Sequence, residues 1–270
     1  EGGGRAAESC AGDEVSPQTG LGGSVGARPV GTCDETQAAQ QVREMFARIA
    51  PRYDLLNHLL SFELDRLWRR RVARRFQHIA RRADAHVLDL CCGTGDLTRA
   101  LERAGRARVF GADFVHPMLV RAREKAVRAN RSSSPSAYAE ADALALPFAD
   151  HSFDLVTLAF GFRNLANYEW GLREIRRVLR PGGEVGILEF AEPRGTLLGR
   201  VYRFYFTKVI PRVGGVISGS AAAYAYLPSS VAEFPQPEAL AAMMSGAGFS
   251  DVSFELWTLS SVALHTGRRA

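Results

Sequence analysis

Residues 87–96 constrain the fold most, because an apolar strand there runs through a two-glycine turn into a helix. Gly93 and Gly95 let the backbone approach a ligand with no Cβ atom in the way, and the start of the helix offers free N–H groups. This arrangement is typical of open α/β sheets that bind a ligand at the carboxyl ends of their strands. A tight turn without a ligand is the alternative.

Strands and helices alternate regularly along the chain after residue 85. The alternation predicts one doubly wound α/β domain, with a mostly parallel, seven-stranded sheet and helices on both faces. The last two strands are joined without a helix, so one strand is expected to be antiparallel. The expected strands are residues 86–91, 107–113, 137–141, 153–160, 184–190, 249–256 and 257–266, and the expected helices between them are residues 96–104, 117–130, 169–179 and 237–247.

The N-terminal part of the chain divides into a tail and a helical region. Residues 1–35 hold many Gly and almost no large apolar side chains, which predicts disorder because little surface can be buried to offset the ordering entropy. Apolar residues at helical spacing over residues 36–84 predict one helix before Pro51 and another over residues 64–79. One domain is therefore expected over residues 36–270.

The second of these helices carries a run of arginines beside its apolar stripe. Because no acidic residue interrupts the run, this face indicates either a solvated surface or one that lies on anionic lipid headgroups. The formal net charge of +5 fits an anionic membrane, a nucleic acid or an acidic ligand. No apolar run reaches the roughly 18 residues of a membrane-spanning helix. The arginines are Arg66, Arg69, Arg70, Arg74 and Arg75.

The cysteines do not have the spacing of a disulfide framework. Cys10 and Cys33 lie in the glycine-rich tail, whereas Cys91 and Cys92 are adjacent in an apolar strand. Unreactive thiols in a reducing, cytosolic setting are therefore expected. The N-terminus shows no secretory apolar segment and is too acidic for a typical transit peptide.

Two carboxylates lie where the next expected strands end. Asp113, 18 positions after Gly95, can accept hydrogen bonds from both hydroxyls of a ribose, with capping of the next helix as the alternative. Asp142 can bind the amino group of an adenine between apolar neighbours. With the glycine turn, these residues indicate a site for a nucleoside with a small charged tail. A dinucleotide site is the runner-up, but Thr98 occupies the position of the third glycine that a pyrophosphate needs.

This combination resembles the class I methyltransferases that use S-adenosylmethionine (SAM), whose Rossmann-like fold agrees with the expected sheet. More specific segments resemble the quinone-biosynthesis C-methyltransferases, which comprise demethylmenaquinone methyltransferase and its ubiquinone-pathway relatives. The likeness covers about residues 41–268. The segments that carry it are MFARIAPRYDLLN at 45–57, AFGFRN at 159–164, LEF at 188–190, the Tyr, Leu, Ser, Phe and Pro of 226–235, and VALH at 262–265.

The resemblance implies that SAM is the methyl donor and that no metal is needed. His58 and His116 lie where variation is expected, so neither is given a catalytic role. Some relatives carry Ser at the position of Ala159, and the hydroxyl contact is lost here. The residues that the resemblance implies for SAM binding are Asp89, Gly93, Thr94, Gly95, Asp113, Asp142, Ala143 and Ala159.

The implied reaction is transfer of the SAM methyl group to a ring carbon of a prenylated quinol. An aromatic carbon is a poor nucleophile until a ring hydroxyl is deprotonated, so the protein must bind the phenolate or remove its proton. Arg163 is expected to lower the quinol pKa, and Asn164 to orient the ring; a surface ion pair is the alternative for Arg163. Tyr53 and Asn57 are expected to close the site as an N-terminal lid.

An irregular, aromatic-rich insertion at residues 197–226 is expected to cover the substrate. Residues 201–210 within it are expected to hold the prenyl tail, with a core-packing helix as the alternative. The mixture of basic and aromatic side chains also predicts a peripheral contact with a membrane surface. The expected location is the cytoplasm, on the inner face of the cell membrane.

Demethylmenaquinol is the expected acceptor. A benzoquinol of the ubiquinone pathway, a small molecule or RNA as the methyl acceptor, and a SAM-binding module without catalysis are the alternatives. No nucleic-acid partner is expected, because no basic module is visible beyond the arginine-rich helix. A homodimer is one option that the sequence leaves open.

Overall fold

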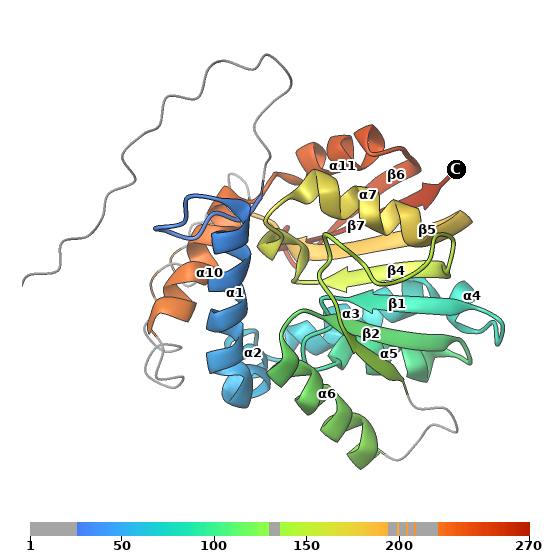
Figure 1. Cartoon of the computed structure of the whole chain (residues 1–270), viewed down its shortest axis with the longest axis horizontal. Helices are drawn as coiled ribbons and strands as arrows, with labels where there is room; N and C mark the ends of the chain where they lie inside the picture. The colour runs from blue at the N-terminus through green and yellow to red at the C-terminus, as the bar shows by residue number, and fades with distance from the viewer. Residues whose placement is uncertain (1–25, 130–135, 194–198, 200–203, 205–207, 209–220) are drawn as a thin grey trace, which may run out of the picture.

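The structure is a computed structural model that describes residues 26–129, 136–193, 199, 204, 208 and 221–270. A seven-stranded sheet forms its centre, in the order β3-β2-β1-β4-β5-β7-β6 (Figure 1). β7 is antiparallel to β5 and β6, and the other neighbouring pairs are parallel, as expected. The strands are β1 (His86–Leu90), β2 (Arg108–Asp113), β3 (Ala137–Glu140), β4 (Phe153–Ala159), β5 (Leu179–Phe190), β6 (Phe249–Trp257) and β7 (Val262–Arg269).

Helices cover both faces of the sheet, and the blue α1 stands beside the orange α10 at one end of the strands (Figure 1). Two short 3-10 helices, η1 and η2, follow α1 and β4. The helices are α1 (Glu35–Ile49), η1 (Ala50–Arg52), α2 (Tyr53–Leu60), α3 (Leu64–Arg75), α4 (Gln77–Ala80), α5 (Asp96–Ala104), α6 (His116–Ala129), η2 (Phe162–Asn164), α7 (Tyr168–Val178), α10 (Ala221–Glu233) and α11 (Pro237–Gly246).

Alternating side chains on the strands divide the core between the two faces of the sheet. Leu88 and Val156 belong to the cluster that α7 and α11 complete. Their neighbours Val87 and Leu155 belong to the cluster that α3, α4 and α5 complete. All four side chains are fully buried. Because successive residues of a strand point to opposite faces, such continuous apolar strands require a helical layer on each side.

The N-terminal helices differ from the expected pair in two places. A separate helix, α2, follows α1, and the helix expected over residues 64–79 is interrupted at Phe76 between α3 and α4. The Phe76 ring is fully buried, and a Cβ atom on Gly186 would lie 2.4 Å from it. The Phe76 ring therefore packs directly against β5 at the position of the break. The sequence shows a continuous apolar stripe there and gives no sign of the break.

Residues 26–35 make defined contacts with the rest of the chain. Ala27 is buried and its N–H donates to the carbonyl of Leu165 at 2.8 Å, while Arg28 donates to the carbonyl of Ala166 at 2.8 Å. The expectation of disorder was therefore wrong for residues 26–35. Backbone and guanidinium hydrogen bonds hold this segment, although it has few apolar side chains to bury.

The thiols are not all alike. Cys33 is disulfide-bonded, so the expectation of unpaired thiols was wrong for this residue. Cys91 and Cys92 are free, and burial raises the pKa of both thiols well above the usual value. Since the thiolate is the reactive form, these two thiols are unreactive at neutral pH.

Removing the Phe76 ring leaves a cavity between β5 and the helices. We expect Phe76→Ala to lower the free energy of unfolding by about 3–5 kcal/mol, the usual cost of truncating a buried aromatic side chain. Urea unfolding followed by circular dichroism measures the change. Leu67→Ala on α3 removes an exposed side chain and is the control, with an expected change within about 0.5 kcal/mol. Equal effects of the two variants would contradict the close packing of the Phe76 ring against β5.

Candidate active site

The turn after β1 depends on left-handed backbone conformations. Gly93 and Gly95 have φ values of 54° and 79°, and Cys91 also has a positive φ of 54°. A Cβ atom on Gly95 would lie 2.9 Å from the Tyr138 hydroxyl, so both the backbone and the space require glycine. Gly95 caps α5 without a side-chain hydrogen bond, and the positive end of the helix therefore faces the turn.

Asp89 lies in β1 beneath this turn and is almost fully buried. The hydroxyl of Thr98 donates to its Oδ2 at 2.6 Å, and that of Thr157 to its Oδ1 at 3.3 Å. Burial raises the pKa of Asp89 to about 7, and the two hydroxyls oppose this only in part. The side chain of Thr98 thus fills the space that a dinucleotide site would leave free, which disfavours a pyrophosphate.

Asp113 ties the ends of β1 and β2 together. Its Oδ2 accepts from the Gly93 N–H at 2.8 Å, and its Oδ1 accepts from the Val115 N–H at 2.9 Å. Burial raises the pKa of Asp113 to about 6 against the effect of these donors, so at neutral pH the group is mainly a carboxylate. Each oxygen keeps a further lone pair that is able to accept a hydrogen bond from a ligand.

Asp113 lines a cavity of about 700 Å³, which we name the Asp113 cavity and which has the size of a small-molecule site. Asp142 lies on its wall with Oδ1 accepting from the Leu144 N–H at 2.9 Å, and Ala143 lies beside it. The structure therefore brings together the acids that end β2 and follow β3. Other residues on the wall are Phe46, Tyr53, Gly93, Phe114, Met118, Ala159 and Asn164.

A smaller cavity of about 310 Å³, the Thr94 cavity, lies over the glycine turn. Its walls come from the turn, from β1 and from two N-terminal helices. The predicted residues Asp89, Gly93, Thr94 and Ala159 all line it. The other lining residues are Tyr53, Arg69, Cys91, Cys92, Asp96 and Leu97.

A third cavity, the Arg163 cavity, encloses about 660 Å³ between β4, β5 and the N-terminal helices. Arg163 is buried, and its Nη1 donates to Glu189 Oε2 at 3.0 Å and to the carbonyl of Phe160 at 2.6 Å. The surface ion pair considered as an alternative was therefore wrong, because this pair is buried. Among the described residues, none accepts a hydrogen bond from Arg163 Nε, although that atom is buried.

The other predicted catalytic residues lie around the same cavities. Asn164 Oδ1 accepts from the Tyr226 hydroxyl at 3.2 Å, and this bond joins the Asp113 cavity to the Arg163 cavity. Tyr53 lines all three cavities, and Asn57 lines the Arg163 cavity. Burial raises the pKa of Tyr53, and the positive charge of Arg69 offsets this only in part. Tyr53 thus keeps its phenol proton at neutral pH.

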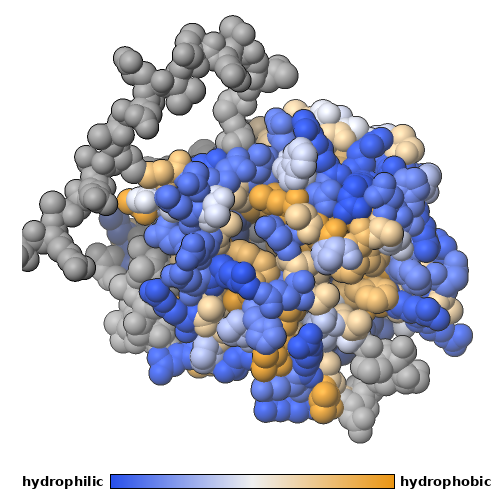
Figure 2. All heavy atoms as spheres, in the orientation of Figure 1, coloured by the Kyte–Doolittle hydropathy of each residue, from blue (hydrophilic) through white to orange (hydrophobic). Residues whose placement is uncertain are grey.

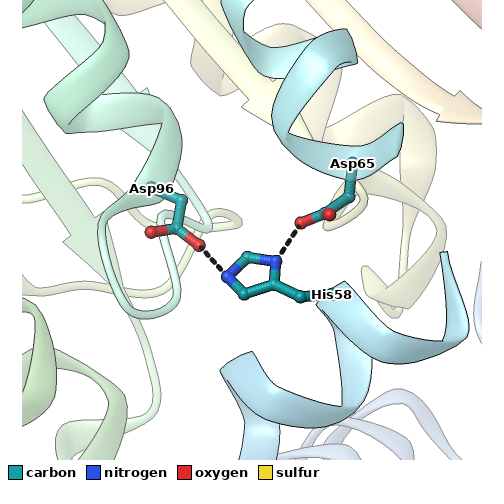
Figure 3. Close-up of side chains that lie close together, drawn as sticks. All are labelled: His58, Asp65 and Asp96. Atoms are coloured by element: carbon teal, nitrogen blue, oxygen red, sulfur yellow. Dashed lines mark hydrogen bonds and ion pairs between the residues drawn. The ribbon is translucent and has the colours of Figure 1, made fainter. Parts of the chain in front are cut away.

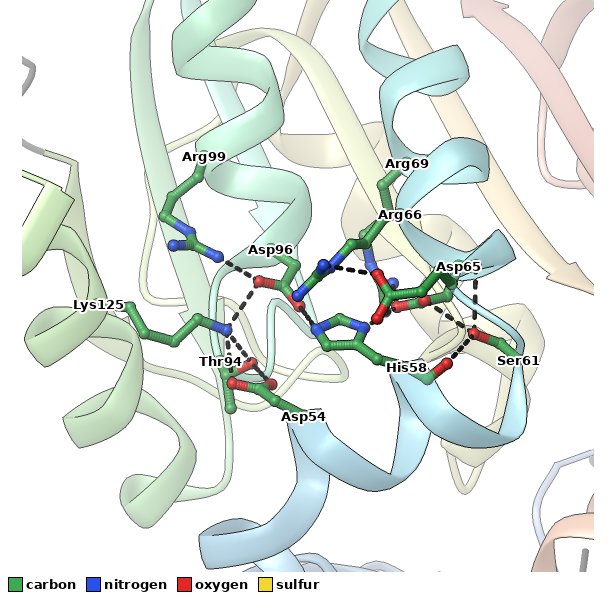
Figure 4. A network of polar contacts seen from close by, with 11 residues as sticks. Asp54, His58, Ser61, Asp65, Arg66, Arg69, Thr94, Asp96, Arg99 and Lys125 are labelled. Carbon is green, nitrogen blue, oxygen red and sulfur yellow. Dashed lines mark hydrogen bonds and ion pairs between the residues drawn. The ribbon is translucent and has the colours of Figure 1, made fainter.

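A polar network fastens the N-terminal helices to the glycine turn (Figure 4). Lys125 of α6 donates to Asp54 at 2.7 Å, to Thr94 at 2.9 Å and to Asp96 at 2.7 Å. Asp54 belongs to α2, and Asp96 begins α5. One ammonium therefore holds α2 against the turn. No local sequence pattern predicts this contact, because its partners lie far apart along the chain.

His58 lies between two carboxylates (Figure 3). Its Nδ1 is 2.9 Å from Asp65 Oδ2, and its Nε2 is 3.7 Å from Asp96 Oδ2. That His58 has no catalytic role stays a prediction, and its largely buried ring bridges α2, α3 and α5. His116, by contrast, pairs with the partly exposed Glu140 at 3.0 Å, outside the cavities.

Arg69 does not belong to the solvated arginine face that the sequence predicts. It is buried, ion-paired with Asp65 one helical turn earlier, and its guanidinium lies 5.5 Å from the Phe160 ring centroid. The spacing of Asp65 and Arg69 beside the apolar Trp68 was the signal available in the sequence. Arg66 and Arg70 of the same helix are exposed, as expected.

The ligand atoms of His58, Asp65 and Asp96 lie within 4.8 Å of one another, which is close enough for a metal ion. Asp65 already binds Arg69, however, and Asp96 already binds Lys125. A divalent ion would have to displace both cations from these carboxylates. The expectation that no metal takes part stays a prediction.

Residues 201–210, expected to hold a prenyl tail, lie outside the described residues except for 204 and 208.

Solved structures share this fold. A SAM-dependent methyltransferase from Thermotoga maritima matches with a TM-score of 0.59 at 17% identity, over 85% of this chain and 100% of that chain. The cyclase SpnF matches with a TM-score of 0.65 at 16% identity, over 92% of this chain and 99% of that chain. At such identities the likeness shows the fold alone. The sheet order and the turn define the class I SAM-dependent methyltransferase fold.

Sequence comparison narrows this class to a family. The model of the ubiE/COQ5 methyltransferase family matches residues 34–269, and the chain belongs to this family. Demethylmenaquinone methyltransferase of Thermus thermophilus is 54% identical over 226 residues, which cover 83% of this chain and 100% of the relative. Ubiquinone/menaquinone biosynthesis C-methyltransferase UbiE of Geotalea daltonii is 41% identical over 238 residues, which cover 87% and 98%. The expected family is confirmed, and with it a SAM-dependent methyltransferase of quinone biosynthesis.

Asp89 makes the stability of the fold depend on pH. Its pKa is about 7 in the folded chain against 3.8 for an ordinary Asp, so raising the pH from about 4 to about 7 ionises it in the unfolded chain first. Because the unfolded chain releases its proton first, the free energy of unfolding falls as the pH rises over this interval. We expect Asp89→Asn to remove this part of the pH dependence, so that the variant gains stability relative to the parent across that interval. Urea unfolding at a series of pH values tests it.

Asp251→Asn, at an exposed position in β6, is the matched control and should leave the pH dependence unchanged. A difference between parent and Asp89→Asn that stays constant over the interval would contradict the role of burial.

Proposed function

We propose that the chain transfers the methyl group of SAM to a ring carbon of a prenylated quinol, with demethylmenaquinol as the acceptor. The observation that carries the proposal is the buried, positively charged and otherwise largely apolar Arg163 cavity, which adjoins the Asp113 and Thr94 cavities at Tyr53. A nucleoside donor and an aromatic acceptor require two such neighbouring spaces.

The residues of the donor side fit SAM. Asp113 presents a carboxylate with free lone pairs for ribose hydroxyls, and Asp142 lies on the same wall for the adenine amino group. The turn at Gly93 leaves space above the backbone, where a Cβ atom would meet nothing closer than the Tyr53 ring at 3.8 Å. SAM, when bound, supplies an electrophilic methyl group on a sulfonium. Thr94, Ala143 and Ala159 would complete its surroundings.

The residues of the acceptor side favour a phenolate. Arg163 lines the cavity and is fixed by Glu189, so a positive charge lies beside the acceptor. A cation there stabilises the deprotonated ring hydroxyl and lowers the quinol pKa. Burial raises the pKa of Tyr226 to about 12, and its hydroxyl therefore stays a donor that holds Asn164. Asn57 and Tyr53 of α2 would orient the ring from the opposite wall.

The choice of quinone rests on the relatives. Two relatives named demethylmenaquinone methyltransferase, from Thermus thermophilus and Deinococcus radiodurans, are 54% and 52% identical to this chain. The relative of Geotalea daltonii, whose name includes both quinones, is 41% identical. The higher identity supports demethylmenaquinol. A ubiquinone-pathway benzoquinol is the second candidate, because the name of the Geotalea daltonii relative also includes ubiquinone.

We further propose that the protein binds the inner face of the cell membrane peripherally. Within the described residues, no helix has the length and hydropathy that crossing a membrane requires. Hydrophilic residues cover most of the face in Figure 2, with hydrophobic residues gathered near its centre. Exposed apolar side chains also gather at the turn between α2 and α3, which we name the α2–α3 corner: Leu55, Leu59, Phe62 and Leu67. The exposed Arg66 and Arg70 beside this corner would meet anionic headgroups.

Methyl transfer tests the proposed function directly. The purified protein is incubated with methyl-labelled SAM and either demethylmenaquinol or the prenylated benzoquinol, and the label is followed into the lipid fraction. We expect label in menaquinol. Label in the benzoquinol alone would replace the first acceptor by the second candidate, and label in neither would refute the proposal.

The double variant Arg163→Met, Glu189→Gln tests the phenolate role without leaving either charge unpaired in the interior. Loss of the cation should lower kcat by about 100-fold or more, the size of effect typical of one positioned electrostatic group. The affinity for S-adenosylhomocysteine should stay unchanged. Full turnover by the double variant would remove Arg163 from the mechanism.

The membrane contact is tested by sedimentation with phosphatidylglycerol vesicles at low salt. Phe62 is 71% exposed, and we expect Phe62→Asp to lower the bound fraction by about 10-fold or more, because a bulky apolar contact is replaced by a charge that anionic lipid repels. Val127→Asp on α6, where the side chain is 77% exposed, is the control and should bind like the parent. Equal binding by both variants would show that the α2–α3 corner does not face the membrane.

A further inference from the structure

The Thr94 cavity has to accommodate the most polar part of SAM, its methionine tail. This tail carries an ammonium and a carboxylate at neutral pH. The cavity lies over the glycine turn and next to the Asp113 cavity, with which it shares Gly93 and Ala159. Burying a carboxylate is unfavourable unless a cation or several donors meet it. The carboxylate of the methionine tail therefore needs a cation near the turn that is not fully occupied by other partners.

Two of the nearby cations are already committed. Lys125 donates its three N–H groups to Asp54, Thr94 and Asp96, which uses all the donors of an ammonium. Arg99 donates to Asp96 and does not line the cavity. Neither side chain has reason to leave its partners for a ligand.

Arg69 is the cation that lines the Thr94 cavity within the described part of the chain. The hydrogen bond from its Nη1 to Asp65 uses one of the five N–H groups of a guanidinium. Figure 4 shows the guanidinium extended from α3 between Asp65 and Asp96, above the glycine turn. No other hydrogen bond from Arg69 is present among the described residues, so several donors stay available.

The charges around the cavity match a zwitterion. Asp96 and Asp65 raise the pKa of Arg69 despite its burial, so the guanidinium is positively charged. Asp96 would repel a carboxylate, but Lys125 and Arg99 both bind it and offset its charge. Asp89 lines the same cavity on the side of β1 and offers an acid to the ammonium.

We propose that Arg69 of α3 binds the carboxylate of the methionine tail of SAM. The SAM site then extends beyond the sheet and its turn to the N-terminal helices. Arg69 acts as a positioning residue, since it holds the donor and does not touch the methyl group. The inference rests on SAM as the donor and is independent of which acceptor is methylated.

Two ligands that differ in the tail test the proposal. S-adenosylhomocysteine carries the amino-acid tail, whereas 5′-methylthioadenosine keeps the nucleoside and the sulfur but lacks the tail. Calorimetry with the double variant Arg69→Met, Asp65→Asn, which leaves no unpaired buried charge, should show an affinity for S-adenosylhomocysteine lowered about 10- to 100-fold. The affinity for 5′-methylthioadenosine should stay unchanged.

Two further variants sharpen the result. Arg69→Lys keeps a cation and should recover part of the affinity for S-adenosylhomocysteine. Arg66→Met, on the exposed face of the same helix, should bind both ligands like the parent.

Each remaining outcome would overturn the proposal. Equal losses for the two ligands would mean that Arg69 only maintains the fold. Normal binding of both ligands with loss of turnover would assign Arg69 to the acceptor in the Arg163 cavity. A parent protein that binds neither ligand would refute the SAM site itself. Failure to methylate a quinol, by contrast, would leave these binding results and the role of Arg69 intact.

Discussion

The site depends on one hydrogen bond, from the Gly93 N–H to the carboxylate of Asp113. It joins the ends of β1 and β2 and requires the left-handed backbone that Gly93 adopts at φ 54°. The rest of the site is placed relative to this bond. α5 starts from the same turn, Lys125 reaches the turn at Thr94, and α2 is fastened above it through Asp54. A change in the turn would therefore displace both the nucleoside contacts and the helices that cover them.

Two buried guanidinium groups define the chemistry of the space opposite the turn. Arg69 and Arg163 are each held by a buried carboxylate, and each lies near an aromatic ring, Phe160 or Phe190, whose centroids are 4.6 Å apart. Buried charges are costly when single and are tolerated when paired in this way. The result is a largely apolar enclosure with two guanidinium groups in its wall, next to which an aromatic anion is more stable than in an apolar space without a cation.

The sheet, the glycine turn and the acid positions were predictable because strand periodicity, glycine and acids at strand ends are local signals. Asp113 and Asp142 lie on one wall, as parallel strands require. Arg69 was predicted to lie on the solvated face of its helix, but it is buried. A run of arginines does not show which of them point into the core when the helix packs. The contacts of His58 could not be predicted, because its partner Asp96 lies far along the chain and meets it only after α2 folds over the turn. Such contacts arise from tertiary packing and leave no sequence pattern.

Tyr53 forms part of the wall of all three cavities. A substitution at this position would alter the recognition of the methyl donor and of the acceptor together, so the preference for one could not change alone. Divergence towards another quinone is therefore restricted to side chains that line only the Arg163 cavity, such as Met45, Ile49 and Leu227. The lining therefore divides into positions that are free to vary during evolution and shared positions, with Tyr53 common to all three cavities, that are bound to keep their identity.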